Sequence, residues 1–269
     1  MSQRVLVSRA DHIAYVTLNR PEKHNGIDAK MLEELIAAAK LIRRDRSIRC
    51  VILKGEGASF CAGLDFAAMT RKPSTIARFF LKWPWQKDNR FQRVAHIWRD
   101  LPMPVIAVLH GSCFGGGAQI ALACDFRIAH PETEMALMEM KWGLVPDMSG
   151  MVTLSRLTRV DIASDLAMTG RRFSAQQAAE YGLVTQLSDT PLEAAKAMAA
   201  IIVAQSPDAV AGVKYLLKKS WKKDTRMALL FERWTQLRLL GRKNQKRAMA
   251  NGLQKDKPKK SFADRSSFR

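Results

Sequence analysis

The sequence of 269 residues contains no uninterrupted apolar run of the roughly 18 residues that would predict a membrane span. It also has no apolar segment directly after Met1, where a secretory signal would lie. Its four cysteines, Cys50, Cys61, Cys113 and Cys124, form no CxxC pair, which argues against a zinc site or a disulfide framework. We therefore expect a cytoplasmic protein with no membrane span, no bound metal and no disulfide.

Common nucleotide-binding and hydrolase signatures are missing as well. The glycines between residues 111 and 117 fit neither the Rossmann spacing nor the phosphate loop with its Gly-Lys-Ser/Thr ending. Ser112 has no Gly-x-Ser-x-Gly context, so a hydrolase nucleophile elbow is unsupported. These absences leave the glycines to be explained in another way.

Acidic residues are scarce relative to basic ones. The chain has 44 Lys and Arg against 25 Asp and Glu, a formal net charge of +19. Residues 214–269 hold 18 basic and 4 acidic residues, so 14 of these net charges lie in the last fifth of the chain. Such a block can be a solvated helical face, an anion site or a nucleic-acid contact surface, and the sequence leaves these open.

Two glycine-containing stretches are the most informative features that the chain does have. They are residues 60–65 (FCAGLD) and 111–119 (GSCFGGGAQ), and each follows a probable strand. Glycine permits turns closed to other residues and a close approach of another molecule to the backbone. Two peptide N–H groups aimed at one point can stabilise an oxygen that becomes negative during a reaction. A single glycine run is usually only a turn, so the accompanying motifs decide the interpretation.

Together with other motifs, these stretches resemble the crotonase (enoyl-CoA hydratase/isomerase) family over most of residues 4–262. The matching segments, in chain order, are 18–25 (LNRPEKHN), 60–65, 111–125, 139–147 (EMKWGLVPD), 169–171 (TGR) and 178–184 (AAEYGLV). The resemblance implies an α/β fold, with a crotonase-like spiral of ββα units over residues 1–200. It also implies a C-terminal helical region with a basic tail over residues 201–269, which in the family makes contacts within trimers that commonly stack into hexamers.

The resemblance implies an acyl-CoA substrate, with coenzyme A as part of the substrate and no separate cofactor. The backbone N–H groups of Leu64 and Gly116 would form the oxyanion hole. Glu139 and Gln119 take the positions of two glutamates that hold water in hydratases of the family. Gln119 can donate and accept hydrogen bonds, but it cannot take up or release a proton near neutral pH. A positioned acid–base group contributes about 10²–10⁴-fold in rate. Efficient hydration is therefore not expected.

Double-bond isomerisation needs fewer acid–base groups than hydration, because one carboxylate can carry the proton while the oxyanion hole holds the dienolate. Asp147 lies where dienoyl-CoA isomerases of the family also place an aspartate. Two plainer interpretations stay open: Glu139 as a surface carboxylate, and Asp147 as a helix cap.

A further set of residues would border the CoA moiety in this resemblance. It consists of Arg20, Lys23, Asn25, Ala62, Asp65, Phe66, Lys255 and Lys257. Surface ion pairs are the alternative role for the first three. The two lysines near the C-terminus resemble family lysines that meet a CoA phosphate, sometimes across a subunit interface.

Local patterns predict the secondary structure. Residues 4–7 and 12–18 read as a hairpin around a turn at 9–11, and residues 50–55, 105–111, 126–129 and 134–138 read as strands. Asp28 caps a predicted helix with apolar residues at helical spacing, and a second helix is expected over 117–124. Further helices are predicted over 192–205, 207–219, 227–240 and 243–253. The six Phe and Trp residues between 70 and 99 can pack on the core, wall an acyl pocket, or do both.

Two functions besides catalysis remain open at this stage. The basic C-terminal region, and the existence of RNA-binding members of the crotonase family, permit a nucleic-acid-binding role. Gln119 in place of the usual glutamate permits a catalytically silent CoA-binding scaffold.

Overall fold

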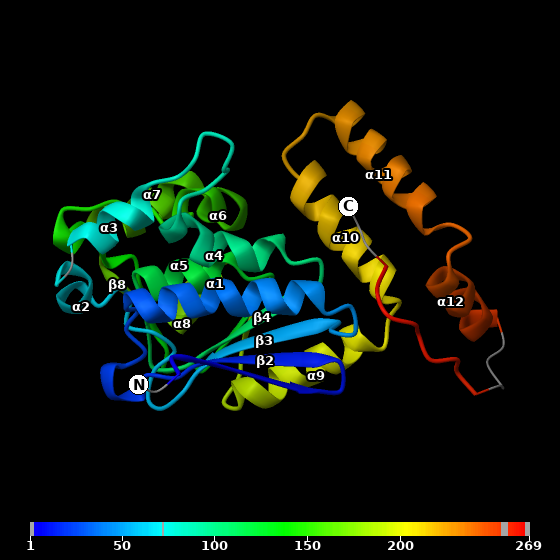
Figure 1. Cartoon of the computed structure of the whole chain (residues 1–269), viewed down its shortest axis with the longest axis horizontal. Coiled ribbons are helices and arrows are strands. Elements are labelled where there is room, and N and C mark those ends of the chain that lie inside the picture. Colours follow the sequence, from blue (N-terminus) through cyan, green and yellow to red (C-terminus); the bar gives the residue numbers. More distant parts are fainter. Residues whose placement is uncertain (1–2, 72, 254–257, 267–269) are drawn as a thin grey trace.

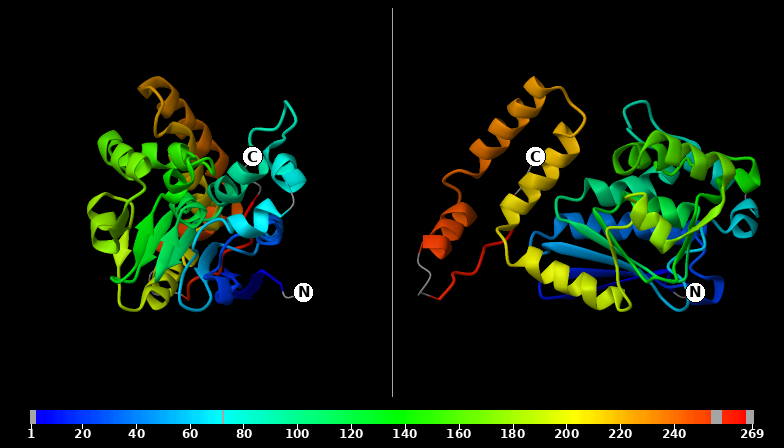
Figure 2. Two further views of the ribbon diagram at one scale, coloured as in Figure 1. Left: turned by 90° about the vertical axis from the view of Figure 1, so that its left-hand side faces the viewer. Right: turned by 180° about the vertical axis from the view of Figure 1, so that it is seen from behind.

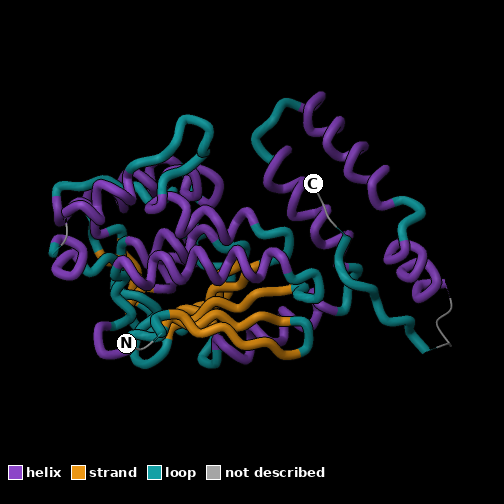
Figure 3. The backbone as a smooth tube through the Cα atoms, viewed as in Figure 1, coloured by secondary structure: helices purple, strands orange, loops and turns teal. Residues whose placement is uncertain are grey.

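The computed structural model describes residues 3–71, 73–253 and 258–266. A six-stranded sheet runs through the body of the molecule (Figures 1 and 3). Its order is β1 (Val5–Ala10), β2 (Ile13–Leu18), β3 (Cys50–Gly55), β4 (Val105–Leu109), β6 (Phe126–Ala129) and β9 (Gln186–Leu187). Only the β1–β2 pair is antiparallel, and every later pair is parallel.

The antiparallel pair is the predicted hairpin, with its turn placed slightly differently. β1 continues to Ala10, which pairs with Ile13, so the loop consists of Asp11 and His12 rather than residues 9–11. Both loop residues have positive φ angles, 49° and 65°. Two-residue hairpin loops favour such angles because their twist matches that of the strands.

A smaller sheet adjoins the first and consists of β5 (Ser112–Phe114), β7 (Glu134–Ala136) and β8 (Arg172–Ser174). β5 was not predicted from the sequence, which suggested one strand through residue 111. The chain instead turns at Gly111, where φ is +55° and an added Cβ would lie 2.0 Å from the carbonyl oxygen of Ala58. Glycine is required at this turn, and it separates β4 from β5.

The large sheet is covered on both faces (Figures 1 and 2). One face packs against α1 (Ala29–Arg44), α4 (Arg90–Asp100) and α5 (Gly116–Ala123), and the other against α9 (Pro191–Val203). In β3, Val51 and Leu53 join the first core while Cys50 and Ile52 join the second, because alternate side chains of a strand point to opposite faces. As predicted, Asp28 caps α1: its Oδ1 accepts a hydrogen bond of 2.8 Å from Met31 N.

The aromatic segment forms α2 (Phe66–Thr70), α3 (Pro73–Phe80), a loop, and α4. Phe79, Phe91 and Trp98 are buried in the core. Trp83 and Trp85 lie exposed in the loop, where their rings stack with centroids 5.2 Å apart. The core-packing interpretation thus holds for only part of the segment.

The chain ends in helices α10 (Pro207–Ser220), α11 (Thr225–Leu239) and α12 (Lys243–Leu253), which extend away from the sheet (Figures 1 and 2). Lys214 docks α10 onto the body, although it belongs to the basic excess of the sequence. Its side chain is 7% exposed, and its Nζ donates to Asp125 Oδ2 (2.6 Å) and to the carbonyl of Met103 (2.8 Å). This lysine is an internal structural cation.

The remaining helices are η1 (Pro21–Lys23), η2 (Met138–Trp142), α6 (Gly150–Leu157), α7 (Val160–Thr169) and α8 (Ala175–Glu180). All four cysteines are free and buried. Within the described ranges, no helix combines the length and apolar character that crossing a bilayer requires. The same residues contain no cluster of His, Cys, Asp or Glu suited to a metal ion.

Candidate active site

The two glycine-containing stretches meet in the structure. Cys61 forms an isolated parallel bridge with Cys113: its N–H donates to Ser112 O (3.0 Å), and its carbonyl accepts from Phe114 N (2.9 Å). Residues 62–65 and 115–119, which follow this bridge, therefore lie next to one another. The sequence predicted the two stretches but not the pairing that joins them.

Glycine is needed where the stretches touch. Gly63 has a φ of +95°, and an added Cβ would lie 3.0 Å from Phe114 O and 3.6 Å from Gly116 N. A Cβ on Gly117 would lie 2.6 Å from the Cβ of Cys61. A side chain at either position would push the two backbones apart.

A cavity of about 550 Å³ opens at this junction. Its lining is mainly apolar, with two carboxylates and one lysine. The lining residues are Ala62, Gly63, Leu64, Phe66, Met69, Thr70, Ile76, Phe80, Phe91, Gly115, Gly116, Met138, Glu139, Lys141, Trp142, Leu144, Val145 and Asp147. An apolar cavity with a few convergent polar groups is the usual form of a small-molecule site.

Leu64 and Gly116 both line this cavity, and their backbone N–H groups donate no hydrogen bond to any residue that the structure describes. Gly116 is the first residue of α5, and Gly115 is its N-cap with a φ of 49°. Free N–H groups and the helix dipole both favour negative charge at such a helix N-terminus. The cavity wall therefore contains two peptide donors available to a bound molecule.

Gln119 and Glu139 are in direct contact beside these donors. Gln119 is 0% exposed, and its Nε2 donates to Glu139 Oε1 at 2.6 Å. Its Oε1 accepts from the backbone N–H groups of Met148 (2.9 Å) and Gly150 (3.0 Å). These bonds fix the amide with its oxygen toward the backbone and its nitrogen toward the carboxylate.

Glu139 is carried by η2 and is only 9% exposed, so it is not a surface carboxylate. Its Oε2 is buried and has no hydrogen-bond partner in the described part of the chain. Burial raises the pKa of Glu139, and the nearby charge of Asp147 raises it further, against the hydrogen bond from Gln119. A carboxyl with a raised pKa and one free oxygen is suited to proton transfer.

Asp147 lies in the loop between η2 and α6, on the wall of the same cavity. It does not cap α6, because the N-cap of that helix is Ser149. Partial burial raises the pKa of Asp147 as well. The site therefore brings two carboxyl groups with raised pKa values to one apolar cavity.

Five of the eight residues expected to border CoA fall into two groups. Ala62 and Phe66 line the cavity. Arg20, Asn25 and Asp65 instead hold the neighbouring loops together through internal hydrogen bonds. Arg20 Nη1 donates to Asp65 Oδ2 and to Gly26 O, each at 2.8 Å, and Asn25 Nδ2 donates to Glu56 O and Ser59 O, each at 2.8 Å.

Three lysines complete this set. Lys23 is exposed at the end of η1. Lys255 and Lys257 lie outside the described residues.

The sequence analysis missed several residues of the cavity wall. Trp142 packs its ring 4.7 Å from that of Phe66, and Lys141 Nζ lies 5.8 Å from the Trp142 ring. Both lie within the motif at 139–147, of which only the carboxylates were singled out. Ile76 of α3 was missed as well, whereas Phe80 of the same helix and Phe91 of α4 line the cavity as the pocket-wall interpretation of the aromatic segment expected.

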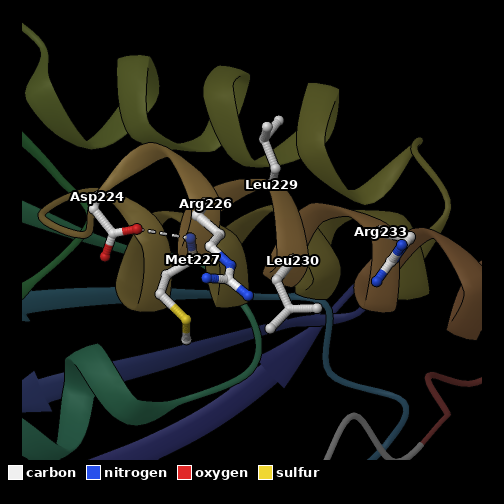
Figure 4. A pocket seen from close by; sticks show the side chains of 6 residues that line it. All are labelled: Asp224, Arg226, Met227, Leu229, Leu230 and Arg233. Carbon is white, nitrogen blue, oxygen red and sulfur yellow. Dashed lines mark hydrogen bonds between the residues drawn. The ribbon is translucent and has the colours of Figure 1, made fainter.

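A second hollow, of about 760 Å³, lies along α11. Figure 4 shows its six lining side chains, all from that helix and its N-cap residue. Its one carboxylate, Asp224, accepts a hydrogen bond from Met227 N (3.0 Å) and so caps the helix. This surface brings no acid–base pair together, and the apolar cavity remains the candidate active site.

Comparison with known proteins defines the class. The family model for enoyl-CoA hydratase/isomerase matches residues 8–265, so the chain belongs to the enoyl-CoA hydratase/isomerase (crotonase) family. The chain is thus an enzyme of this family, as its motifs suggested.

Particular relatives lie on different branches of the family. A Bacillus subtilis protein named for enoyl-CoA hydratase/isomerase is 36% identical over 227 residues, which cover 82% of this chain and 84% of that protein. Mouse mitochondrial Delta(3,5)-Delta(2,4)-dienoyl-CoA isomerase is 33% identical over 221 residues, covering 78% of this chain and 66% of that protein. Carnitinyl-CoA dehydratase of Salmonella typhi is 34% identical, covering 81% of each chain.

Solved structures agree with the crotonase-like fold. An enoyl-CoA hydratase from Bacillus anthracis superposes with a TM-score of 0.85 at 30% identity, covering 95% of this chain and 98% of that one. An enoyl-CoA hydratase from Mycobacterium smegmatis gives 0.84 at 27% identity, covering 96% and 98%.

Proposed function

We propose that the cavity binds an unsaturated acyl-CoA and that the enzyme moves a double bond along its acyl chain. The apolar wall, which includes Phe66, Ile76 and Val145, suits the acyl chain. The free N–H groups of Leu64 and Gly116 would bind the thioester oxygen, which becomes negative when a proton leaves the acyl chain. Preorganised donors of this kind stabilise the charge as it develops.

Glu139 is the proton carrier in this proposal. Its carboxylate takes a proton from one carbon of the acyl chain, the electrons delocalise onto the thioester oxygen as a dienolate, and the proton returns to another carbon. No atom is gained or lost, and the carboxylate is regenerated. Asp147 lies on the same cavity wall. It is a second acid–base group, which would return the proton to a carbon far from the one that lost it.

The direct contact of Gln119 with Glu139 is the observation that favours isomerisation over hydration in this proposal. In hydratases of the family two carboxylates hold a water between them. Here Gln119 Nε2 and Glu139 Oε1 are 2.6 Å apart, which leaves no room for a water between these atoms. Gln119 also cannot take up or release a proton near neutral pH. Hydration of enoyl-CoA is therefore expected to be slow.

The test is a substrate series of enoyl-CoA and 3,5-dienoyl-CoA thioesters of graded chain length. Isomerisation to the conjugated 2,4-dienoyl-CoA and loss of the enoyl double bond are both followed by ultraviolet absorbance. The expected result is isomerisation faster than hydration at every chain length. Glu139→Gln should lower turnover by about 10²–10⁴-fold while binding of a CoA thioester persists.

The matched control is Glu132→Gln, which removes a carboxylate whose side chain is 90% exposed. This variant should keep wild-type turnover. Full activity of Glu139→Gln, or hydration faster than isomerisation throughout the series, would contradict the proposal.

A further inference from the structure

A separate basic cleft lies at the other end of α4 from the apolar cavity. It has a volume of about 530 Å³ and lies among the C-terminal ends of α1 and α4, helix α10, and the segment that contains Arg265. In Figure 1 the ends of α1 and α4 face α10. Eight of the 13 lining residues are Lys or Arg, and one, Asp100, is acidic.

Most of these cations lack a partner. Lys214 is bonded to Asp125, and Lys218 is paired with Asp100, which also lies 3.3 Å from His96 Nδ1. The side chains of Arg43, Arg44, Arg46, Arg99 and Lys219 make no hydrogen bond or ion pair with any described residue. The one acidic group of the cleft is therefore already paired, and these five cations have no direct partner among the described residues, although the charges of Asp125 and Asp100 act on Arg99.

Arg265 is the most telling member of the set. It is 5% exposed, and its Nε and Nη2 are buried without a hydrogen-bond partner in the described part of the chain. Burial lowers the pKa of Arg265, and the charges of Arg46 and Arg43 act in the same direction, whereas the charges of Asp208 and Asp45 raise it. An arginine stays protonated in proteins, so these two nitrogens are donors held in a place that disfavours positive charge.

The helix dipole accounts for only part of this arrangement. Arg43 and Arg44 lie in the last turn of α1, Arg99 in the last turn of α4, and Lys219 in the last turn of α10, where cations interact favourably with the helix end. Arg46 and Arg265 lie outside any helix. Arg265 is held there by its backbone N–H, which donates to Arg46 O (3.1 Å).

We propose that this cleft is a binding site for a chain of phosphate groups, as in inorganic tripolyphosphate or the triphosphate of a nucleotide. Guanidinium groups bind phosphate oxygens through paired, charge-assisted hydrogen bonds. Several cations without a direct partner around one cleft match a ligand with several adjacent negative charges. The volume is that of a small-molecule site.

The cleft is distinct from the proposed acyl-CoA site. Phe91 at the start of α4 lines the apolar cavity, and Arg99 near its end lines the basic cleft. Arg99 follows Phe91 by eight positions, about 12 Å along the helix axis. The two linings have no residue in common.

Calorimetric titration of the full chain with tripolyphosphate, and in parallel with ATP, tests the inference. The expected result is saturable binding of both that weakens as salt rises. Tighter binding of ATP would identify a nucleotide, and equal binding a phosphate chain alone. The variant Arg46→Gln/Arg99→Gln should bind at least about tenfold more weakly, because charge-assisted hydrogen bonds are lost.

The matched control is Arg226→Gln/Arg233→Gln, which removes two exposed arginines of α11 and the same net charge. It should change the affinity by less than about twofold, since exposed charges act weakly at a distance. Circular dichroism verifies folding, and Arg43→Gln/Arg44→Gln, at two exposed positions, replaces the first variant if that one is unfolded.

Three outcomes would overturn the inference. The first is the absence of saturable binding at low salt. The second is an equal loss in the cleft and control variants, which would mean that only overall charge matters. The third is binding that survives the cleft variants but is lost in Lys23→Gln, which would place the phosphates at the expected CoA border.

Discussion

The side chain of Gln119 donates a hydrogen bond of 2.6 Å to Glu139, while its oxygen accepts from two backbone N–H groups. These three bonds fix the amide in one orientation and direct Glu139 Oε1 toward it. Glu139 Oε2 is buried and has no partner among the described residues, so in the proposed mechanism it would be the oxygen that carries the proton. In that mechanism Gln119 would act on the reaction through the position of Glu139.

Glu139→Gln is expected to stabilise the folded protein at neutral pH. Because the pKa of Glu139 is raised above its ordinary value of 4.5, the folded state binds the proton more tightly than the unfolded state. Stability contributed by this group therefore falls as pH rises from 4.5 through the raised pKa, and above it the ionised carboxylate is a net cost.

Thermal unfolding of both proteins between pH 4 and pH 8 measures this effect. The variant should unfold at a higher temperature at pH 8, and the difference should shrink as pH approaches 4. Glu132→Gln, at an exposed position, should show no such trend. A variant that is less stable than wild type at pH 8 would refute the raised pKa.

Gly116→Pro tests the proposed oxyanion donor by removing its N–H. Proline is tolerated at the first position of a helix, which Gly116 occupies in α5. The expected loss in kcat is about 10²–10³-fold, the usual cost of one such donor.

Gly116→Ala is the matched control because it keeps the N–H. In both variants the new Cβ meets Met148 Sδ, 2.8 Å from its ideal position, so both should perturb packing in the same way. Steady-state kinetics should show the proline variant far below the alanine variant. Equal activities would remove the Gly116 N–H from the mechanism.

Gln119→Glu should shift the enzyme toward hydration. The new carboxylate can still accept from Met148 N and Gly150 N, but its other oxygen would lie against Glu139 Oε1. Like charges at this separation favour a shared proton, which raises one of the two pKa values. A second proton-exchanging group then becomes available to activate water.

The ratio of hydration to isomerisation, measured on one enoyl-CoA and one dienoyl-CoA, gives the readout, and it should rise at least about tenfold. Gln119→Met, which is similar in size but cannot exchange protons, is the control and should not raise the ratio. An unchanged ratio in Gln119→Glu would show that Gln119 does not limit hydration.

Lys214→Met should destabilise the protein by about 3–5 kcal/mol, because it leaves the partly buried Asp125 without its cation. Asp125 Oδ2 would keep only the hydrogen bond from Val105 N (2.8 Å). Denaturant unfolding measures the loss. Lys223→Met, at an exposed position of the same C-terminal region, should stay within about 0.5 kcal/mol of wild type.

Much of the fold could be predicted from local patterns. The bounds of β3 and β6 agree with the predicted residues 50–55 and 126–129, and α12 agrees with residues 243–253. These segments combine a clear period with turn or capping residues at their ends. β5 was missed because a strand of three residues beside glycines has no period of its own; pairing with β7 creates it.

The candidate site was likewise predicted only in part from the sequence. Its motifs named Leu64, Gly116, Glu139 and Asp147, which all line one cavity. The motifs could not show that the side chains of Arg20 and Asn25 form their hydrogen bonds within the protein. Their partners include residues 30 or more positions away in the sequence.

The sequence by itself determined many of the strands and helices, the two glycine-containing stretches, and the family to which the chain belongs. Periodicity, the backbone angles that a residue type permits, and the order of motifs are local properties, so they can be inferred from the amino-acid sequence. Only the tertiary structure decided that Gln119 contacts Glu139, that Lys214 is internal, and that Arg265 joins arginines more than 150 positions away in one cleft. These facts depend on how distant segments meet, and burial then sets the pKa and the partners of each charged group.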